Sequence, residues 1–282
     1  MNSSLTRPEL VRKYFTKTPA KPSEPDYSGH KQKMLVGGGL VLVSLLLLFS
    51  GQGLLVFSGI ISGYFSFKFL KDGFFAYSKQ KNKYELDCEK YEKDYAMAEP
   101  KPSDEQMDQW MHDDIEKTIA EALRRLDMES DDYRATPLLI GGPASLEETR
   151  FAKGKDSKLR YSHFNILVIF LTEYHVASYQ CDSSMEYGQI LTDRTQEFPY
   201  KEVTNLGTQV VKEKIRLLDD VMDSESGMQE FTLATSGANV IKVAYKFDRN
   251  TNFQGELVEI GGEQTIAAIR KKLQDYKQKY EK

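Results

Sequence analysis

The chain has 282 residues, with 38 lysine and arginine residues against 42 aspartate and glutamate residues and a formal net charge of -4. This acidic balance excludes a protein that holds nucleic acid through a broadly basic surface. Two cysteines are too few for a disulfide framework or for a zinc site with four thiolates. The mean hydropathy of -0.51 is typical of a water-soluble protein, but it averages two regions of opposite character.

The first of these regions is an uncharged run near the N-terminus. Residues 34–67 contain no Asp, Glu, Lys, Arg or His. A helix that spans a bilayer needs about 20 apolar residues, so the run is too long for one span and just long enough for two. Ser50-Gly51-Gln52-Gly53 interrupts it with residues that favour a turn. We therefore predict two transmembrane helices, at residues 31–50 and 53–72.

The charges that flank this run predict its orientation. Residues 1–33 hold seven Lys and Arg residues, residues 68–83 hold five, and the turn holds none. Basic flanks stay in the cytoplasm, so we expect a multi-pass protein with both termini cytoplasmic. A cleaved signal peptide is the alternative, but the charged leader is too long and no cleavage site of small residues follows the apolar run.

Small residues inside the two predicted spans indicate how the helices contact each other. Glycines let helix backbones approach closely in a membrane, and Gly59 and Gly63 form a GxxxG pattern. Chance composition is the alternative interpretation. The candidate packing positions, which are also candidates for association into a homo-oligomer, are Gly37, Gly38, Gly39, Gly59 and Gly63.

Two further segments flank the predicted anchor. Residues 1–30 carry four prolines among Ser, Thr and Lys, a composition that cannot bury a core, so we predict a disordered basic arm. Residues 73–130 carry apolar side chains at helical spacing on both sides of Glu99-Pro100-Lys101-Pro102, and Ser103 with Gln106 matches a capping box. We predict an amphipathic helical hairpin in the cytoplasm for this segment.

From residue 131 to 282 the pattern changes to strands. Gly141-Gly142-Pro143 indicates a turn, and Tyr161–Leu171 is a continuous apolar run of the kind found in buried strands. Later segments alternate between apolar and polar residues, which is typical of antiparallel strands with one wet face. Apolar residues at spacings of three and four predict a closing helix at residues 263–281. The expected fold class is an α+β membrane protein.

Four stretches in this region carry a recognisable pattern: Phe170-Leu171-Thr172-Glu173-Tyr174-His175-Val176, Phe198-Pro199-Tyr200-Lys201-Glu202-Val203-Thr204-Asn205-Leu206, Phe231-Thr232-Leu233-Ala234-Thr235-Ser236-Gly237 and Ile241-Lys242-Val243. Together they resemble bacterial pleckstrin-homology-like (PH-like) domains over residues 157–282. The resemblance implies a partly open antiparallel β-barrel plugged by the final helix, used for binding rather than catalysis. It also implies a bacterial inner-membrane location, since paired membrane helices precede such domains in that family. An acidic stretch departs from the compact version of the domain at Asp219, Asp220, Asp223 and Glu225.

The strongest candidate binding residues are a basic cluster before the first long strand: Lys153, Lys155, Lys158 and Arg160. In lipid-binding members of the wider fold, cations near the first hairpin hold phosphorylated headgroups. Ordinary solvated side chains are the alternative. The histidines lack metal-ligand spacing, and no phosphate loop or nucleophile elbow occurs. We therefore expect no catalytic residues, no cofactor and no metal.

These features favour a membrane-anchored, non-enzymatic binding or scaffold protein. It would present a cytoplasmic PH-like module to a protein partner or to a membrane complex, with the lipid bilayer as its second partner. The alternative is a module that senses anionic lipid through the basic cluster, and a membrane-bound enzyme is the third hypothesis. The sequence does not identify the protein partner.

Overall fold

The structure is a computed structural model that describes residues 5–49, 53–129, 136–144, 149–215, 224–237, 240–247, 256–257 and 260–280. Asp219, Asp220 and Asp223 of the acidic stretch lie outside these residues. The chain divides into two compact units. We call residues 18–97 the hairpin unit, and residues 1–17 together with 98–282 the module.

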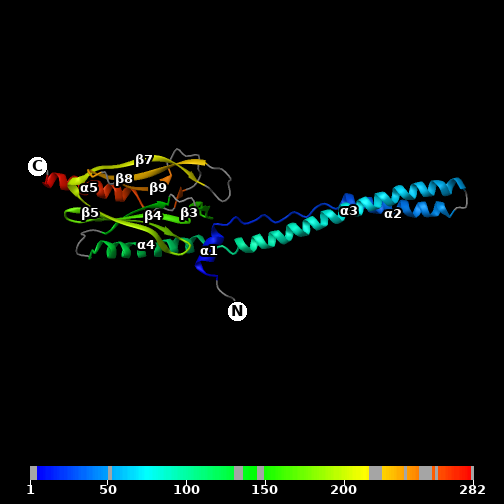
Figure 1. Cartoon of the computed structure of the whole chain (residues 1–282), viewed down its shortest axis with the longest axis horizontal. Coiled ribbons are helices and arrows are strands. Elements are labelled where there is room, and N and C mark those ends of the chain that lie inside the picture. Colours follow the sequence, from blue (N-terminus) through cyan, green and yellow to red (C-terminus); the bar gives the residue numbers. More distant parts are fainter. Residues whose placement is uncertain are drawn as a thin grey trace. The chain divides into compact units, whose positions relative to one another are not determined.

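Two antiparallel helices form the hairpin unit (Figure 1). Helix α2 (Ser28–Leu48) has 21 residues and helix α3 (Gly53–Ala98) has 46. Among the described residues, α2 is the one helix long and apolar enough to cross a membrane. The predicted end of the second helix at residue 72 is wrong, because residues 53–72 are the first part of the longer helix α3. No proline interrupts the chain between Gly53 and Pro100, so the helix continues to Ala98.

The module contains the remaining elements. They are α1 (Arg7–Tyr14), α4 (Asp104–Leu126), β1 (Leu138–Pro143), β2 (Phe151–Lys153), β3 (Lys158–Tyr161), β4 (His163–Leu171), β5 (His175–Ser184), β6 (Gln189–Pro199), η1 (Tyr200–Glu202), β7 (Val203–Ile215), β8 (Ser224–Thr235), β9 (Val240–Phe247), β10 (Glu256–Leu257), β11 (Ile260–Gly261) and α5 (Glu263–Tyr280). Helix α5 lies where the sequence places the closing helix.

A five-stranded sheet with the order β11-β1-β4-β5-β6 is the middle layer of the module. Strand β4 sends alternate side chains to its two faces: Phe164 and Ile166 join one core cluster, and Leu167 and Ile169 join the other. Helix α4 covers the first face, while the β7-β8-β9 sheet covers the second, with α5 packed at η1 and β1 (Figure 1). Because both faces are covered, the strand carries apolar residues on both of them from Ile166 to Leu171, which explains this part of the run in the sequence.

The predicted partly open β-barrel does not form. The described strands lie in three sheets that do not close: the central five-stranded sheet, the β7-β8-β9 sheet and a small β10-β3-β2 sheet. The mixed α+β class is confirmed, and every pairing except β10 with β3 is antiparallel.

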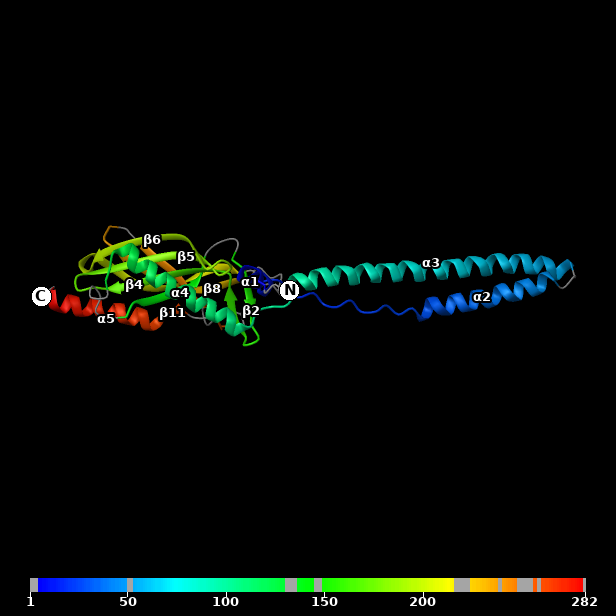
Figure 2. The same ribbon diagram turned by 90° about the horizontal axis from the view of Figure 1, so that it is seen from below.

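The predicted helical hairpin of residues 73–130 is also wrong. Helix α4 packs against β4, β5 and β6, as Figure 2 shows, and its stripe of Met107, Trp110 and Ile115 joins the core cluster on that face of the sheet. Helix α3 belongs to the hairpin unit. The apolar stripe of α4 therefore contacts a sheet instead of a neighbouring helix.

Gly141 and Gly142 lie inside β1 and not in the predicted turn. A Cβ atom added to Gly142 would fall on the backbone carbonyl of Ala244 in β9, and one added to Gly141 would lie 2.9 Å from the Cβ of Ile260. Gly142 thus lets the β7-β8-β9 sheet approach β1 closely, and Gly141 leaves room for Ile260 of the neighbouring strand β11. A close approach between strands far apart in sequence gives the same local signal as a turn.

The N-terminal segment is only partly the disordered arm that its composition predicts. Residues Arg7–Tyr14 form helix α1, and Val11, Tyr14 and Phe15 are buried in the core cluster beneath α4. The prediction of disorder over residues 1–30 is therefore wrong for α1. The four prolines lower the average apolar content of the segment and conceal this short buried patch.

Candidate functional sites

Helix α1 forms because its first turn is strongly capped. The backbone N–H of Thr6 donates to the Glu9 carboxylate at 2.8 Å, and Pro8 occupies a first-turn position that needs no hydrogen-bond donor. The Thr6-Arg7-Pro8-Glu9 sequence is the signal that would have revealed the helix. Sequence reasoning missed it because the composition of the longer segment dominated the interpretation.

Arg7 fixes the start of α1 to the module. Its guanidinium pairs with Asp114 of α4, which is nearly buried, and its Nε donates to the carbonyl of Met185 at 3.0 Å. It also stacks over the Trp110 ring at 5.4 Å from the centroid. Arg12 extends the contact by donating to Glu186 at 2.5 Å and to the Tyr187 hydroxyl at 2.6 Å.

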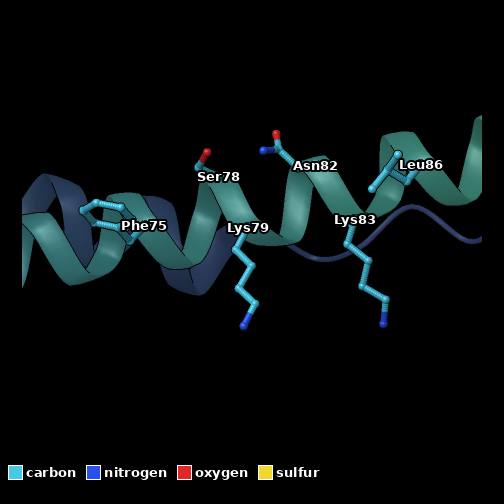
Figure 3. Close-up of a pocket in the computed structure, with 6 residues that line it drawn as sticks. All are labelled: Phe75, Ser78, Lys79, Asn82, Lys83 and Leu86. Carbon is cyan, nitrogen blue, oxygen red and sulfur yellow. The ribbon is translucent and has the colours of Figure 1, made fainter.

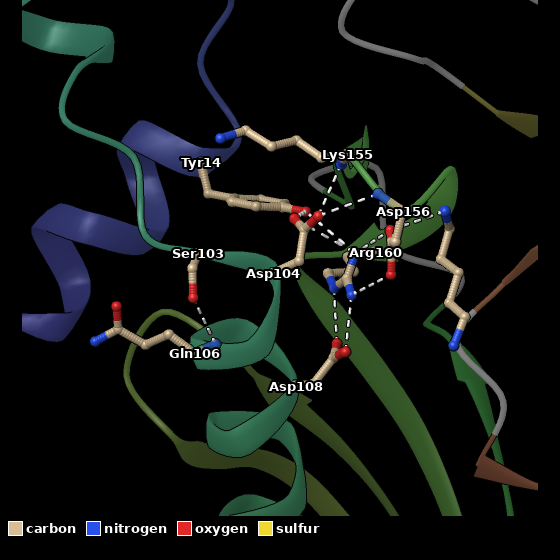
Figure 4. A network of polar contacts seen from close by, with 9 residues as sticks. Tyr14, Ser103, Asp104, Gln106, Asp108, Lys155, Asp156 and Arg160 are labelled. Atoms are coloured by element: carbon tan, nitrogen blue, oxygen red, sulfur yellow. Dashed lines mark hydrogen bonds and ion pairs between the residues drawn. The ribbon is translucent and has the colours of Figure 1, made fainter.

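Arg160 connects α1, α4 and the β2–β3 turn (Figure 4). Its side chain is 3% exposed and forms a bidentate pair with Asp108, with N–O distances of 2.7 and 2.8 Å. It also donates to Asp156 at 2.9 Å, and it lies 3.6 Å from Asp104. Asp104 accepts the Tyr14 hydroxyl at 2.8 Å and the backbone N–H of Lys155 at 2.7 Å. We call Tyr14, Asp104, Asp108, Asp156 and Arg160 the Arg160 network.

Electrostatics hold this network in its charged form. The hydrogen bond from Arg160 is the main reason that the pKa of Asp156 falls to about 2. Burial alone would lower the pKa of Arg160, but its hydrogen bonds to Asp108 and Asp156 outweigh burial and raise it. Burial, followed by the hydrogen bond to Asp104, raises the pKa of Tyr14 well above its ordinary range. The network therefore carries a permanent cation neutralised by aspartates.

The predicted lipid-contact residues are not brought together as one cationic site. Arg160 is buried among carboxylates. Lys153 ends β2, Lys158 begins β3, and both are exposed on the outside of the hairpin. The Lys155 ammonium extends away from Arg160 in Figure 4. Arg160 acts in packing, and what is left of the cluster is three separate surface lysines.

The network and Arg7 together hold two distant points of the chain in one place. Tyr14 precedes residues 18–97, Asp104 follows them, and the two side chains share a hydrogen bond. The Lys13 ammonium also donates to the carbonyl of Glu99 at 2.6 Å. The hairpin unit is therefore an insertion whose two ends are fastened to a single folded module.

In the hairpin unit, three of the five predicted glycines lie where α2 meets α3. A Cβ added to Gly37 would lie 3.1 Å from the Leu70 backbone, and one added to Gly59 would lie 3.1 Å from the Ser44 carbonyl. At Gly63 the added atom would make ordinary contact with Ser44 at 3.7 Å. Gly38 and Gly39 have nothing within 4 Å of the added position, so they lie off this contact.

Serine side chains also lie in the contact between α2 and α3. The Ser44 and Ser62 hydroxyls are 2.8 Å apart across the two helices, and Ser44 also donates to the Leu40 carbonyl at 2.8 Å. Ser66 donates to the Ser62 carbonyl at 2.6 Å and is almost fully buried. We call Gly37, Ser44, Gly59, Ser62, Gly63 and Ser66 the small-residue seam.

No catalytic constellation appears in the described part of the chain. No group of three or more His, Cys, Asp or Glu residues could hold a metal ion there. Burial raises the pKa of the Cys181 thiol to about 12, so this thiol is not a poised nucleophile. The contacts described above hold α1 against α4 and α2 against α3. Comparison of the chain with protein-family models, with curated proteins and with solved structures gives no match.

Proposed function

We propose that this chain is a membrane-anchored, non-enzymatic binding or scaffold protein. The hairpin unit inserts into the bacterial inner membrane, and the module is displayed in the cytoplasm to a protein partner or a membrane complex. The observation that carries the proposal is the pattern of burial in the hairpin unit.

Large apolar side chains of the hairpin unit point outward, and small ones point inward. Leu35 is 78% exposed, Leu46 is 74% exposed and Phe57 is 67% exposed. The contact between the helices is the small-residue seam instead. Water penalises so large an exposed apolar surface, whereas lipid favours it and leaves close packing and hydrogen bonds to join the helices.

The position of α1 limits how the chain can cross a membrane. Because α1 and α4 are joined by the Arg7–Asp114 and Tyr14–Asp104 contacts, residues 17 and 98 must lie on the same side. Residues 18–97 then cross an even number of times. If α2 crosses the membrane, the first part of α3 must cross it in the opposite direction. This supports two spans, although α2 is the one described helix that is long and apolar enough to be a candidate span.

The charges around α2 and α3 support the cytoplasmic location of the module. Seven Lys and Arg residues precede residue 34 and five follow between residues 68 and 83. The turn between the helices carries none. The positive-inside rule places the basic ends in the cytoplasm, and the module is attached at both of those ends.

The hairpin unit also contains a stalk. Residues 73–98 of α3 extend about 39 Å at the helical rise. Beside them runs an extended segment, residues 18–27, in which Pro19, Pro22 and Pro25 fall at the period of a polyproline helix and are less exposed than most of their neighbours (Figure 1). Ten residues of that helix span about 31 Å. Two legs of similar length make a braced spacer, which suits display of a module to a partner.

The alternative of lipid sensing by the module loses its main support. Arg160 is committed to Asp108 and Asp156, so the cation best suited to grip a phosphate is occupied. Enzymatic function has no candidate residue among those described. A binding function is the one that the remaining features favour.

Labelling from each side of the membrane tests the proposal. Cysteines are placed at Lys17, Phe49 and Lys101, one at a time in a Cys88→Ser background, and treated with an impermeant maleimide in vesicles of known orientation. We expect Phe49→Cys to react on one side, and Lys17→Cys and Lys101→Cys on the other. Reaction of Lys17→Cys and Lys101→Cys on opposite sides, or release of the protein by alkaline carbonate, would refute the anchor.

A further inference from the structure

We infer that the membrane-proximal part of α3 carries a binding site for the phosphate of an anionic phospholipid. The site is a shallow groove of about 460 Å³ lined by Phe75, Ser78, Lys79, Asn82, Lys83 and Leu86 (Figure 3). This inference rests on the proposed membrane insertion of the hairpin unit. It moves lipid contact from the β2–β3 region, where the sequence places it, to a helix of the anchor.

The groove begins at the level where the bilayer should end. About 20 residues of helix cross the hydrocarbon core, so a span that begins at Gly53 reaches the headgroups near Gly73. The Tyr27 and Tyr77 rings meet edge to face there, 5.2 Å apart. Tyrosines concentrate at membrane interfaces, and Phe75 lies between Gly73 and Tyr77. The lining residues follow within the next three turns.

The walls of the groove are chemically different. Lys79 and Lys83 are four residues apart and extend from one side of the helix in Figure 3, while Ser78 and Asn82 extend from the other. The lysines supply the charge that binds phosphate oxygens, and the hydroxyl and amide on the other side supply hydrogen-bond donors to neighbouring headgroup oxygens. Phe75 and Leu86, which are 61% and 65% exposed, provide apolar surface at the two ends.

Charge selects an anionic occupant. Between residues 68 and 83 five lysines face one acidic residue, Asp72. Lys81 already pairs with Glu85 at 3.7 Å, and Lys71 lies over the Phe75 ring at 5.7 Å. Within α3 no ion pair engages Lys79 or Lys83. The long side chains of Lys79 and Lys83 are flexible enough to bring their ammonium groups to the headgroups.

Tryptophan quenching by brominated lipid measures the site in the full chain. The reporter is Phe75→Trp with Trp110→Phe, reconstituted in vesicles that mix phosphatidylglycerol and phosphatidylcholine, one of them brominated. We expect phosphatidylglycerol to be enriched at the reporter. Lys79→Gln with Lys83→Gln should reduce the preference about fivefold for each lysine, because each contributes a similar interaction with an anionic surface.

The matched control is Lys90→Gln with Lys93→Gln, which removes the same charge farther along α3. The inference is overturned if the control reduces the preference as much as the groove variant, or if the groove variant leaves it unchanged. Displacement by glycerol phosphate at matched ionic strength would overturn the assignment to a bilayer lipid. Alkaline extraction of the same vesicles separates the two proposals: retained protein without lipid preference refutes the groove, and released protein refutes the anchor.

Discussion

In the module, large side chains such as Leu167 and Tyr179 are fully buried, whereas in the hairpin unit Leu35 and Leu46 are exposed and Gly37 and Ser44 are buried. The two units therefore follow opposite rules of packing within one chain. The module is organised by removing apolar surface from water. The hairpin unit is organised by close contact of small residues, which is how helices associate when the surrounding solvent is itself apolar.

The second contrast concerns charge. The apolar part of the hairpin unit contains no Asp, Glu, Lys, Arg or His between Met34 and Phe67. The module buries Arg160, and it does so by surrounding the guanidinium with carboxylates. A buried cation is tolerated only when its hydrogen bonds and counter-ions are complete.

The largest effect should come from Arg160→Met. The change removes the shared partner of Asp104, Asp108 and Asp156. The free energy of unfolding of the module should fall by about 3 kcal/mol, which is the lower end of the range for breaking a buried ion pair, because the carboxylates are partly exposed. Urea unfolding of the full chain in detergent, followed by the single tryptophan, Trp110, measures it. Lys155→Met removes a charge from the same hairpin and should change stability by less than about 0.5 kcal/mol. Equal losses would show that Arg160 is not a structural cation.

A smaller loss should follow from Gly59→Leu in the small-residue seam. The new side chain would meet the Ser44 carbonyl and the Leu47 Cβ within 3.2 Å, so the helices must separate at a cost of about 2 kcal/mol. Disulfide yield between Ser44→Cys and Ser62→Cys in a Cys88→Ser background reports the separation. Gly38→Leu, which has nothing within 4 Å, should leave the yield unchanged. A drop in both variants would mean that α2 and α3 do not meet at this seam.

Elements with a local signal could be predicted from the sequence. The apolar helix α2, the closing helix α5 and the strand β4 each carry a long, regular pattern. Small residues in an apolar helix favour close contact between helices, and of the five candidate glycines, Gly37, Gly59 and Gly63 lie where α2 meets α3. Local periodicity is enough to predict an element when the element is long and its surroundings are uniform.

What the sequence did not reveal depends on distant partners. The stripe on α4 has the same spacing whether it meets a helix or a sheet, so the predicted hairpin was wrong. Gly142 faces Ala244, about a hundred residues later, and a glycine pair is read locally as a turn. Arg160 looked like a surface cation because its partners lie on α1, α4 and the preceding turn. Contacts between segments that are far apart in the sequence produce no periodic pattern in it.

Acid should weaken the module more than the hairpin unit. The pKa of Asp156 is lowered to about 2 from its ordinary value of 3.8, so its pairing contributes fully above about pH 4 and is lost as the pH falls toward 2. Because Asp156 is partly exposed, the loss should be about 1 kcal/mol. Unfolding titrations from pH 5 to pH 2 should show this slope, and Asp156→Asn should flatten it. A slope that persists unchanged in the variant would assign the effect to other carboxylates.

The smallest effect should come from Ser44→Ala, which tests whether the hairpin unit is held by hydrogen bonds as well as by close packing. The Ser44–Ser62 contact at 2.8 Å is replaced by a methyl group of nearly the same size, so packing is preserved while the interhelical hydrogen bond is lost. Such bonds contribute about 0.6 kcal/mol in membranes because the separated helices find other partners. Thermal unfolding in detergent should therefore detect a small loss, and Ser62→Ala in the same background should add almost nothing further. Full additivity of the two changes would mean that the hydroxyls act separately, each through its own backbone bond, and that close packing alone joins α2 to α3.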